Sequence, residues 1–475
     1  MSRARSLISD TVVLAFGTLG GRVIGILLLP LYTYCLTRAE FGTVELIVTS
    51  IDLVLPLIFL TISEAVLRFA MTRGERKGDV LRTGMTFVGG GTCFVVLAAA
   101  VFCVWVPVVQ VSLVASIIVV QAVNLVLGAW ARAIDQVLTY AVSGLFQAAT
   151  IGLANVAFLL VLDLGVPGFL LSLLVGYVVS AVLLMIRMPV VATVRASSFD
   201  LALLRRMLLF SAPLVPNVVL WWVTNISGRF FLAASHGLDE VGLFGVASRF
   251  PAIVTMATTV FAQAWQLSAN RSVDDEDDDQ GAFYSGVFRF YSAVLILGVS
   301  SLVLVIKPLM RLAASAEFFD AWQAVPPLLV GAMFAAFASF YGAIYTAARR
   351  SSGVLKTTVA AGLASLVLNA LLIPRFGLIG AALSLALCFL GLWTLRIFDS
   401  QSITRTSVSP RLLIPGLALL LIQISAQYSA LPAGWAYGVM AAIWLALLVL
   451  FRREIGEAIS RVRATLSRPR TPGAE

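Results

Sequence analysis

Apolar runs of about twenty residues recur along the whole sequence, and this is the length that a helix needs to cross a membrane. Hydrophobic residues make up 60% of the 475-residue chain and charged residues only 12%, a composition outside the range of ordinary soluble domains. The sequence therefore predicts an all-α polytopic membrane protein. Its fourteen predicted spans lie at residues 10–36, 44–68, 84–105, 107–129, 138–162, 165–186, 207–233, 241–268, 284–306, 322–346, 353–373, 377–395, 412–428 and 433–451.

The distribution of basic residues predicts the orientation of these spans. With the N-terminus inside, most of the 33 Lys and Arg residues fall in cytoplasmic segments, four fall in outer segments, and the rest lie within spans. Because cytoplasmic loops carry an excess of Lys and Arg, both termini are expected in the cytoplasm. The net charge of +9 then reflects membrane topology and does not indicate nucleic-acid binding.

Two internal similarities predict a repeat. The segment LTRAEFGTVEL (residues 36–46) matches HGLDEVGLFGV (residues 236–246) at an offset of 200, and LGVPGFLLSLL (residues 164–174) matches FGLIGAALSLA (residues 376–386) at an offset of 212. Both matches fall between equivalent spans, which indicates two parallel repeats of six helices. The glycines in these segments are interpreted as architectural. The predicted domains are an N-terminal six-helix lobe (residues 1–190), a C-terminal six-helix lobe (residues 191–400), and two extra helices with a basic amphipathic cytoplasmic tail (residues 401–475).

Arginines inside the spans are the main functional signal. A charge at the centre of a membrane is costly, so such a residue is expected to face protein or a wet cavity. Arg22 lies near the middle of the first span, and Arg229 and Arg249 lie in the seventh and eighth. The spans of the second lobe contain no acid, so a cavity between the lobes is expected to favour an anion. Guanidinium groups grip oxyanions bidentately and remain charged at accessible pH.

The seventh span also carries Trp221, Trp222 and Asn225 close to its arginine. Aromatic faces stack on sugar rings and amides bond to hydroxyls, so these side chains are candidates for sugar contacts. Packing or an interfacial position is the alternative, and tryptophans in membrane helices adopt it more often.

No motif for a cofactor, metal or nucleotide is evident. The four cysteines lie in or at the ends of apolar spans without metal-site spacing, the single histidine, His236, falls in a short outer loop, and no GxxxxGK[ST] loop is present. The acidic run DDEDDD (residues 274–279) is interpreted as a solvated cytoplasmic linker, with a metal or partner site as the alternative.

Three segments carry a resemblance to a known family. LGGRVIGILLLPLYTYCLTRAEFGTVELI, SAPLVPNVVLWWVTNISGRFFLAASHGLDEVGLFGVASRF and LVLNALLIPRFGLIGAALSLAL resemble the first lobe, the second lobe and spans eleven to twelve of the polysaccharide transport (Wzx-type oligosaccharide flippase) family. That family belongs to the superfamily that also contains the multidrug and toxin extruders and the lipid II flippase. In one departure from it, Gly228 precedes Arg229 where relatives often carry an acid.

The resemblance implies two lobes around a cavity that opens alternately to either side. It also implies movement of a polyprenyl-pyrophosphate-linked oligosaccharide from the inner to the outer leaflet of the bacterial cytoplasmic membrane, in contact with membrane lipids and with glycan polymerase or other assembly proteins as possible partners. A multidrug extruder of the same fold is the first alternative. A membrane-embedded glycan polymerase or glycosyltransferase is a weaker one, because the short outer loops lack paired carboxylates. The chain is therefore expected not to be an enzyme.

Two acids in the predicted second span are candidates for ion coupling. If a cation or a proton drives transport, Asp52 or Glu64 is expected to bind it, and Asp52 is the deeper of the two. The alternative is a structural carboxylate paired with an arginine. Glu64 and Arg68 are spaced i, i+4, which suits a local ion pair.

Overall fold

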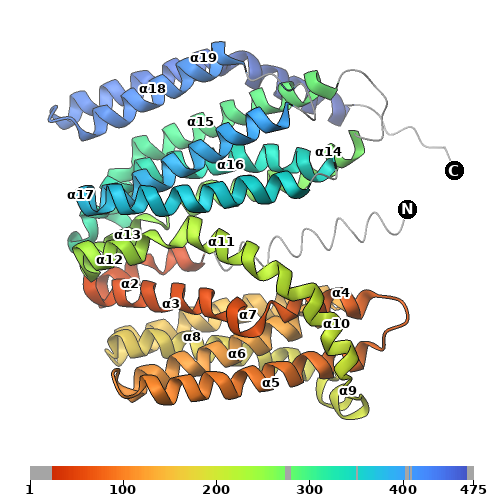
Figure 1. The fold of residues 1–475 in the computed structure, drawn as a ribbon. Coiled ribbons are helices and arrows are strands. Elements are labelled where there is room, and N and C mark those ends of the chain that lie inside the picture. The colour runs from red at the N-terminus through yellow and green to blue at the C-terminus, as the bar shows by residue number, and fades with distance from the viewer. Residues whose placement is uncertain (1–23, 273–279, 349–350, 402–405, 407–408, 468–475) are drawn as a thin grey trace. The chain divides into compact units, whose positions relative to one another are not determined.

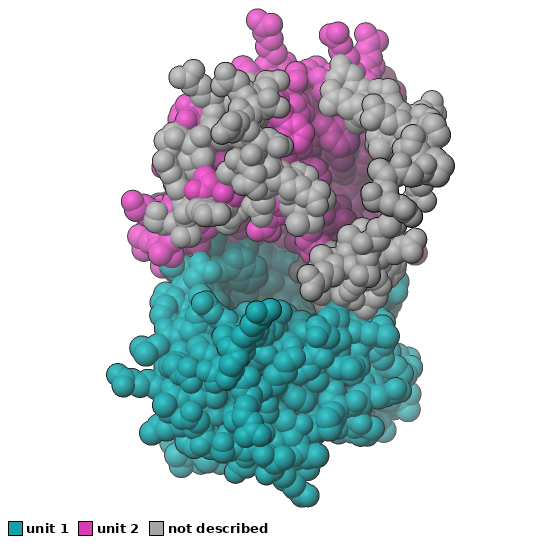
Figure 2. Space-filling view, turned by 90° about the vertical axis from the view of Figure 1, so that its right-hand side faces the viewer, with its two compact units in different colours: residues 1–249, 313–318, 373–378 teal, residues 250–312, 319–372, 379–475 magenta. Residues whose placement is uncertain are grey.

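The computed structural model describes residues 24–272, 280–348, 351–401, 406 and 409–467 (Figure 1). These residues form helices joined by short turns, and none of them lies in a strand. Two compact units are present (Figure 2). Unit 1 takes in residues 1–249, 313–318 and 373–378, and unit 2 takes in residues 250–312, 319–372 and 379–475.

Unit 1 contains the helices of the first predicted repeat and the beginning of the second. In chain order they are α2 (Leu29–Cys35), α3 (Arg38–Phe59), α4 (Ile62–Met71), α5 (Lys77–Phe102), α6 (Val108–Ala133), α7 (Val137–Asn155) with a π-helical end (Val156–Val161), α8 (Gly165–Arg187), α9 (Val190–Ala196), α10 (Leu201–Ser211), a 3₁₀ turn (Ala212–Leu214), α11 (Val215–Ile226), α12 (Gly228–His236) and α13 (Leu238–Ala247).

Unit 2 holds the remaining helices, apart from two short segments that belong to unit 1. Aromatic rings form its core: Phe288 lies 5.3 Å from Phe337 and 5.2 Å from Phe340 between ring centroids, and Phe337 lies 5.3 Å from Trp393. The helices are α14 (Pro251–Ser272), α15 (Gln280–Ala313), a 3₁₀ segment (Ala316–Ala324), α16 (Val325–Ala347), α17 (Ser351–Ser400), α18 (Pro410–Tyr428) and α19 (Ala433–Ser467).

The helices confirm the predicted membrane class. Within the described residues, eleven helices are long and apolar enough to cross a membrane, or twelve if a bent pair forms one span. α17 is counted once among them, although non-helical angles at Gly377 divide it into two helices. The described helices are therefore consistent with fourteen spans without establishing that number. The helix predicted for the basic tail continues α19 as far as Ser467.

The second predicted span is broken, whereas the sequence indicated one continuous helix. α3 begins with a capping box in which the Thr37 hydroxyl accepts a hydrogen bond from the Glu40 N–H and the Glu40 carboxylate accepts one from the Thr37 N–H. The helix ends where Leu60 and Thr61 both adopt left-handed backbone angles, with φ of 48° and 49°. Pro56 has no N–H and so cannot donate the helical hydrogen bond to the residue 52 carbonyl.

The glycines of the first internal similarity pack against each other's segments. A Cβ added at Gly42 would lie 2.0 Å from the Leu238 carbonyl oxygen, and a Cβ at Gly242 would lie 2.1 Å from the Arg38 carbonyl oxygen. Both contacts join positions related by the 200-residue offset, so they are reciprocal. These glycines therefore allow two helix backbones to approach closely, as small residues do in membrane proteins.

The second similarity also has a structural counterpart. Gly165 and Gly377 both adopt positive φ, 55° and 51°, at the turn that starts a helix. Only glycine adopts such angles readily. The two repeats therefore share a glycine with positive φ at this turn as well as a similar sequence.

Candidate functional site

A buried carboxylate in unit 1 binds two of the predicted site arginines. Glu45, on α3, is 7% exposed. Its Oε2 lies 3.3 Å from Arg229 Nε, and its Oε1 accepts a short hydrogen bond from Arg249 Nη2. Arg229 is in the first turn of α12 and Arg249 follows α13, so the cluster joins three segments of the chain. We call these three residues the Glu45 triad.

Aromatic rings flank the triad. The Arg229 guanidinium carbon lies 5.3 Å from the Phe244 ring centroid, and that of Arg249 lies 6.0 Å from the Phe41 centroid. The Arg229 side chain is 13% exposed and that of Arg249 is 34% exposed. The Arg249 side chain is therefore more accessible than that of Arg229 while Glu45 holds both.

Burying charged groups such as those of Glu45 and Arg229 is costly, so the triad needs its internal pairing. Removal of ions from water costs several kcal/mol per ion, which close pairing and hydrogen bonds must offset. Two guanidinium groups share one carboxylate, and a second acid, Asp52, interacts with Arg229 electrostatically without forming an ion pair with it. Two guanidinium groups and one carboxylate leave a net positive charge, so the arrangement is able to hold an oxyanion beside Arg249, the more exposed of the two arginines.

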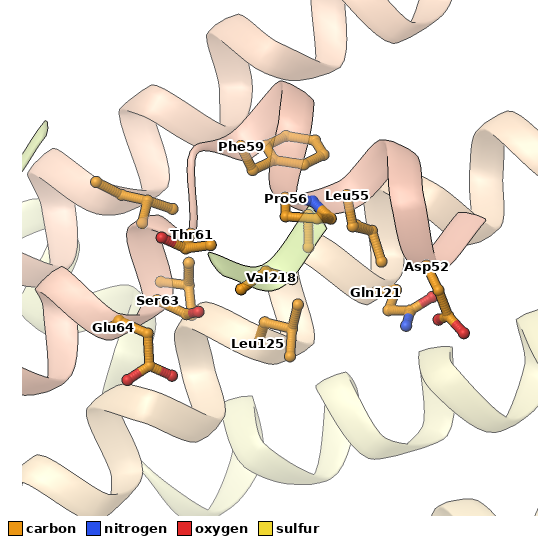
Figure 3. Close-up of a pocket in the computed structure, with 13 residues that line it drawn as sticks. Asp52, Leu55, Pro56, Phe59, Thr61, Ser63, Glu64, Gln121, Leu125 and Val218 are labelled. Carbon is orange, nitrogen blue, oxygen red and sulfur yellow. The ribbon is translucent and has the colours of Figure 1, made fainter. Parts of the chain in front are cut away.

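Asp52 and Glu64 line one cavity of about 280 Å³ in unit 1 (Figure 3). Asp52 is on α3 and Glu64 is in the first turn of α4, so the break at residues 60–61 separates them. Figure 3 shows them at opposite ends of the cavity, with Gln121 of α6 near the Asp52 end. The cavity thus has a carboxylate at each end and a broken helix along one side.

The predicted local pair of Glu64 with Arg68 is not formed among the described residues. The Arg68 guanidinium carbon instead lies 4.3 Å from the centroid of the Phe210 ring. The Glu64 and Arg68 side chains are both exposed. Glu64 is therefore free to face the cavity.

The two tryptophans of the seventh predicted span have different environments. Trp222 is 8% exposed and its Nε1–H donates a 2.8 Å hydrogen bond to the Thr49 carbonyl, so it fixes α11 to α3. Trp221 is 59% exposed. Asn225 is half-buried, and its amide donates a 2.9 Å hydrogen bond to the Trp221 carbonyl within α11. Trp222 therefore has a packing role, whereas the exposed Trp221 ring remains a candidate for a sugar contact.

Two predicted features lie outside the described residues: Arg22 and the acidic run at residues 274–279. In the part of the chain that is described, no group of three or more His, Cys, Asp or Glu side chains is arranged to hold a metal ion.

The sequence interpretation missed Glu45. It lies just inside the second predicted span, seven residues before Asp52 and thus two helical turns away on the same face of α3. That spacing was one sequence signal for Glu45. The other was the presence of arginines, and of no acid, in the predicted spans of the second lobe.

Comparison with known proteins identifies the fold. No family model matches the sequence, and no curated protein matches it. The lipid II flippase MurJ in an inward closed conformation matches with a TM-score of 0.67 at 11% identity, covering 94% of this chain and 100% of that one. An inward-facing multidrug resistance MATE family transporter of the MOP superfamily matches at 0.60 and 14% identity, covering 88% and 96%. A Vibrio cholerae MATE transporter matches at 0.54 and 15% identity, covering 84% and 98%.

This chain has the fold of the MOP-superfamily transporters. The three solved structures are transporters or flippases, and none of them is an enzyme. At these identities the similarity establishes the fold. The narrower resemblance to Wzx-type flippases stays a prediction from the sequence.

Proposed function

We propose that this protein is a flippase that moves a polyprenyl-pyrophosphate-linked oligosaccharide from the inner to the outer leaflet by alternating access. The observation that carries the proposal is the Glu45 triad, in which two guanidinium groups share one buried carboxylate and the Arg249 side chain remains one-third exposed. A pyrophosphate offers the oxyanions that such a guanidinium binds best. Arg22 is proposed as a further contact to the same group.

The energetics of glycan transfer support a protein-lined path. Moving one hydroxyl from water into hydrocarbon without a partner costs about 4–8 kcal/mol, so an oligosaccharide cannot cross the membrane core unaided. The cavity of Figure 3 supplies such partners inside a span-forming unit, through the polar side chains of Asp52, Thr61, Ser63, Glu64 and Gln121. We place the protein in the bacterial cytoplasmic membrane with both termini inside, where a glycan polymerase would use the product.

A multidrug extruder is the second candidate, and the cavity of Figure 3 is the observation that favours it. Asp52 and Glu64 give this cavity two carboxylates and no basic residue. Such a lining suits a cationic drug as well as a coupling ion. The same fold in MATE transporters is compatible with this alternative.

Reconstitution of the full chain in proteoliposomes distinguishes the two functions. The vesicles carry a fluorescent polyprenyl-pyrophosphate-linked saccharide in one set and a lipophilic cationic dye in another. We expect protein-dependent movement of the lipid-linked saccharide to the opposite leaflet, together with a loss of that movement in Arg249→Ala. Dye transport with no saccharide movement above protein-free vesicles would replace the flippase proposal with the extruder.

Arg22→Lys tests the predicted contact of the first span in the same vesicles. This substitution keeps the charge but removes the bidentate fork, so flipping per folded protein is expected to fall. A larger decrease is expected in Arg22→Ala. Full activity of Arg22→Ala would remove Arg22 from the proposed pyrophosphate site.

A further inference from the structure

A second cavity in unit 1, of about 230 Å³, lies between α6, α7 and α8. Each helix faces it with a stripe of residues at helical spacing, so the lining is part of the regular packing of these helices. Its polar side chains are Gln121, Asn124, Arg132, Tyr140, Ser143, Gln147, Tyr177 and Ser180. Polar residues in membrane spans are rare and mark substrate or ion pathways.

Several of these groups have hydrogen-bonding capacity that the protein does not use. Among the described residues, the amides of Gln121 and Gln147 and the hydroxyls of Tyr140 and Tyr177 make no hydrogen bond. Asn124 differs, because its amide donates a 2.6 Å hydrogen bond to the Tyr177 carbonyl and is fixed by it. The cavity thus presents two amides and two phenols, each with a free donor and a free acceptor.

The charge of the lining selects the class of ligand. No lining residue is acidic, which disfavours a cation. Arg132 is the only charged one; its Nε donates to the Gly128 carbonyl at 3.3 Å, and its guanidinium carbon lies 5.2 Å from the Tyr140 ring centroid. One guanidinium that already donates a hydrogen bond to a backbone carbonyl and stacks on a ring is a weak site for a pyrophosphate. The lining instead suits a neutral molecule that is rich in hydroxyl groups.

The volume of the cavity and its aromatic rings narrow the class of ligand further. A volume of about 230 Å³ is below the roughly 300–1,000 Å³ of pockets for drug-sized molecules, so it accommodates one ring and not an oligosaccharide. The Tyr140 ring is held against α6 because Gly128 has no side chain, and a Cβ there would lie 2.7 Å from the ring. A fixed aromatic ring beside amides is the combination that binds a pyranose.

We propose that the α6–α7–α8 cavity binds a single neutral sugar ring of the lipid-linked glycan. The inference rests on the proposed flippase function and extends it by naming where the sugar is held. The site is separate from the Glu45 triad, since the two share no residue. It adjoins the cavity of Figure 3, with which it shares Gln121 and Leu125.

Saturation-transfer NMR on the full chain in nanodiscs tests the proposal. The probes are the methyl glycosides of glucose, galactose, N-acetylglucosamine and rhamnose, with tetraethylammonium as a cationic comparison. We expect transfer to at least one glycoside, and a decrease of at least five-fold in the double variant Gln147→Met with Tyr177→Phe, which removes polar groups at nearly constant volume.

The matched control is Gln110→Met with Tyr34→Phe, the same two changes at positions that do not line the cavity. Transfer in this control should equal that of the unaltered protein. If the cavity double variant does not fold, the single variant Tyr177→Phe decides, with at least a two-fold decrease expected. The proposal is overturned if no glycoside exceeds empty nanodiscs, if the cavity variant binds normally, or if tetraethylammonium shows the same loss.

The leaflet assay separates this proposal from the proposed function. Sugar binding that depends on Gln147 and Tyr177, with no movement of lipid-linked saccharide, would reject the flippase and keep the site. Movement of the lipid-linked saccharide without glycoside binding would reject the site and keep the flippase.

Discussion

The substitution Glu45→Gln is expected to destabilise the protein strongly, because it leaves the largely buried Arg229 and the half-buried Arg249 without their carboxylate. At the 3.3 Å separation of Arg229 Nε from Glu45 Oε2, one ion pair is worth about 5 kcal/mol at an effective dielectric constant near 20. Desolvation offsets part of this energy, so removal of one partner of a buried pair costs about 3–5 kcal/mol. Unfolding in mixed detergent micelles, followed by tryptophan fluorescence, measures the loss.

Glu75→Gln is the matched control, since Glu75 pairs with Arg206 at 2.7 Å on the surface, where the Arg206 side chain is 52% exposed. Exposed pairs contribute about 0–1 kcal/mol, so this variant should unfold almost normally. Replacing Glu45, Arg229 and Arg249 together by Met should restore stability, because an apolar cluster carries no unpaired charge. A loss in Glu45→Gln no larger than that in Glu75→Gln would refute the electrostatic account of the triad.

Three further predictions concern the same unit. Gly42→Ala should lower stability by about 1–3 kcal/mol in the same unfolding assay, because its Cβ would lie 2.0 Å from a backbone oxygen. Gly25→Ala, whose Cβ would have no described atom within 4 Å, should be neutral or slightly stabilising. Trp222→Phe should cost about 1–2 kcal/mol for the lost hydrogen bond to Thr49, whereas Trp221→Phe should change stability by less than about 0.5 kcal/mol. Asp52→Asn should weaken the dependence of transport in proteoliposomes on an imposed ion gradient, and an unchanged dependence would exclude Asp52 from coupling.

The fold class follows from the sequence because the membrane imposes a simple rule. A span must be helical, apolar and of nearly constant length, so composition and run length are sufficient to predict helices. The break between α3 and α4 was not predictable in the same way. Leu60 and Thr61 are ordinary residues in left-handed conformations, and Pro56 was the only local signal.

The candidate site was predictable only in part, because it depends on contacts between distant segments. Arg229 and Arg249 could be selected from the sequence since charges inside spans are rare. Their partner could not be chosen by local spacing, because Glu45 lies 204 residues from Arg249. The separation of Trp221 from Trp222 likewise depends on which face of α11 packs on α3.

The repeat itself contains the information that local spacing lacks. Gly42 packs on residue 238 and Gly242 on residue 38, so each position near this contact faces the one that is 200 residues away. Position 45 therefore faces position 245, and a Cβ at Gly245 would indeed lie 2.7 Å from the Glu45 Cγ. Arg249 is one helical turn beyond Gly245, which brings its guanidinium to the Glu45 carboxylate. The two repeats differ here, with Glu in one and Gly in the other, and this difference gives the carboxylate the space in which it binds both arginines.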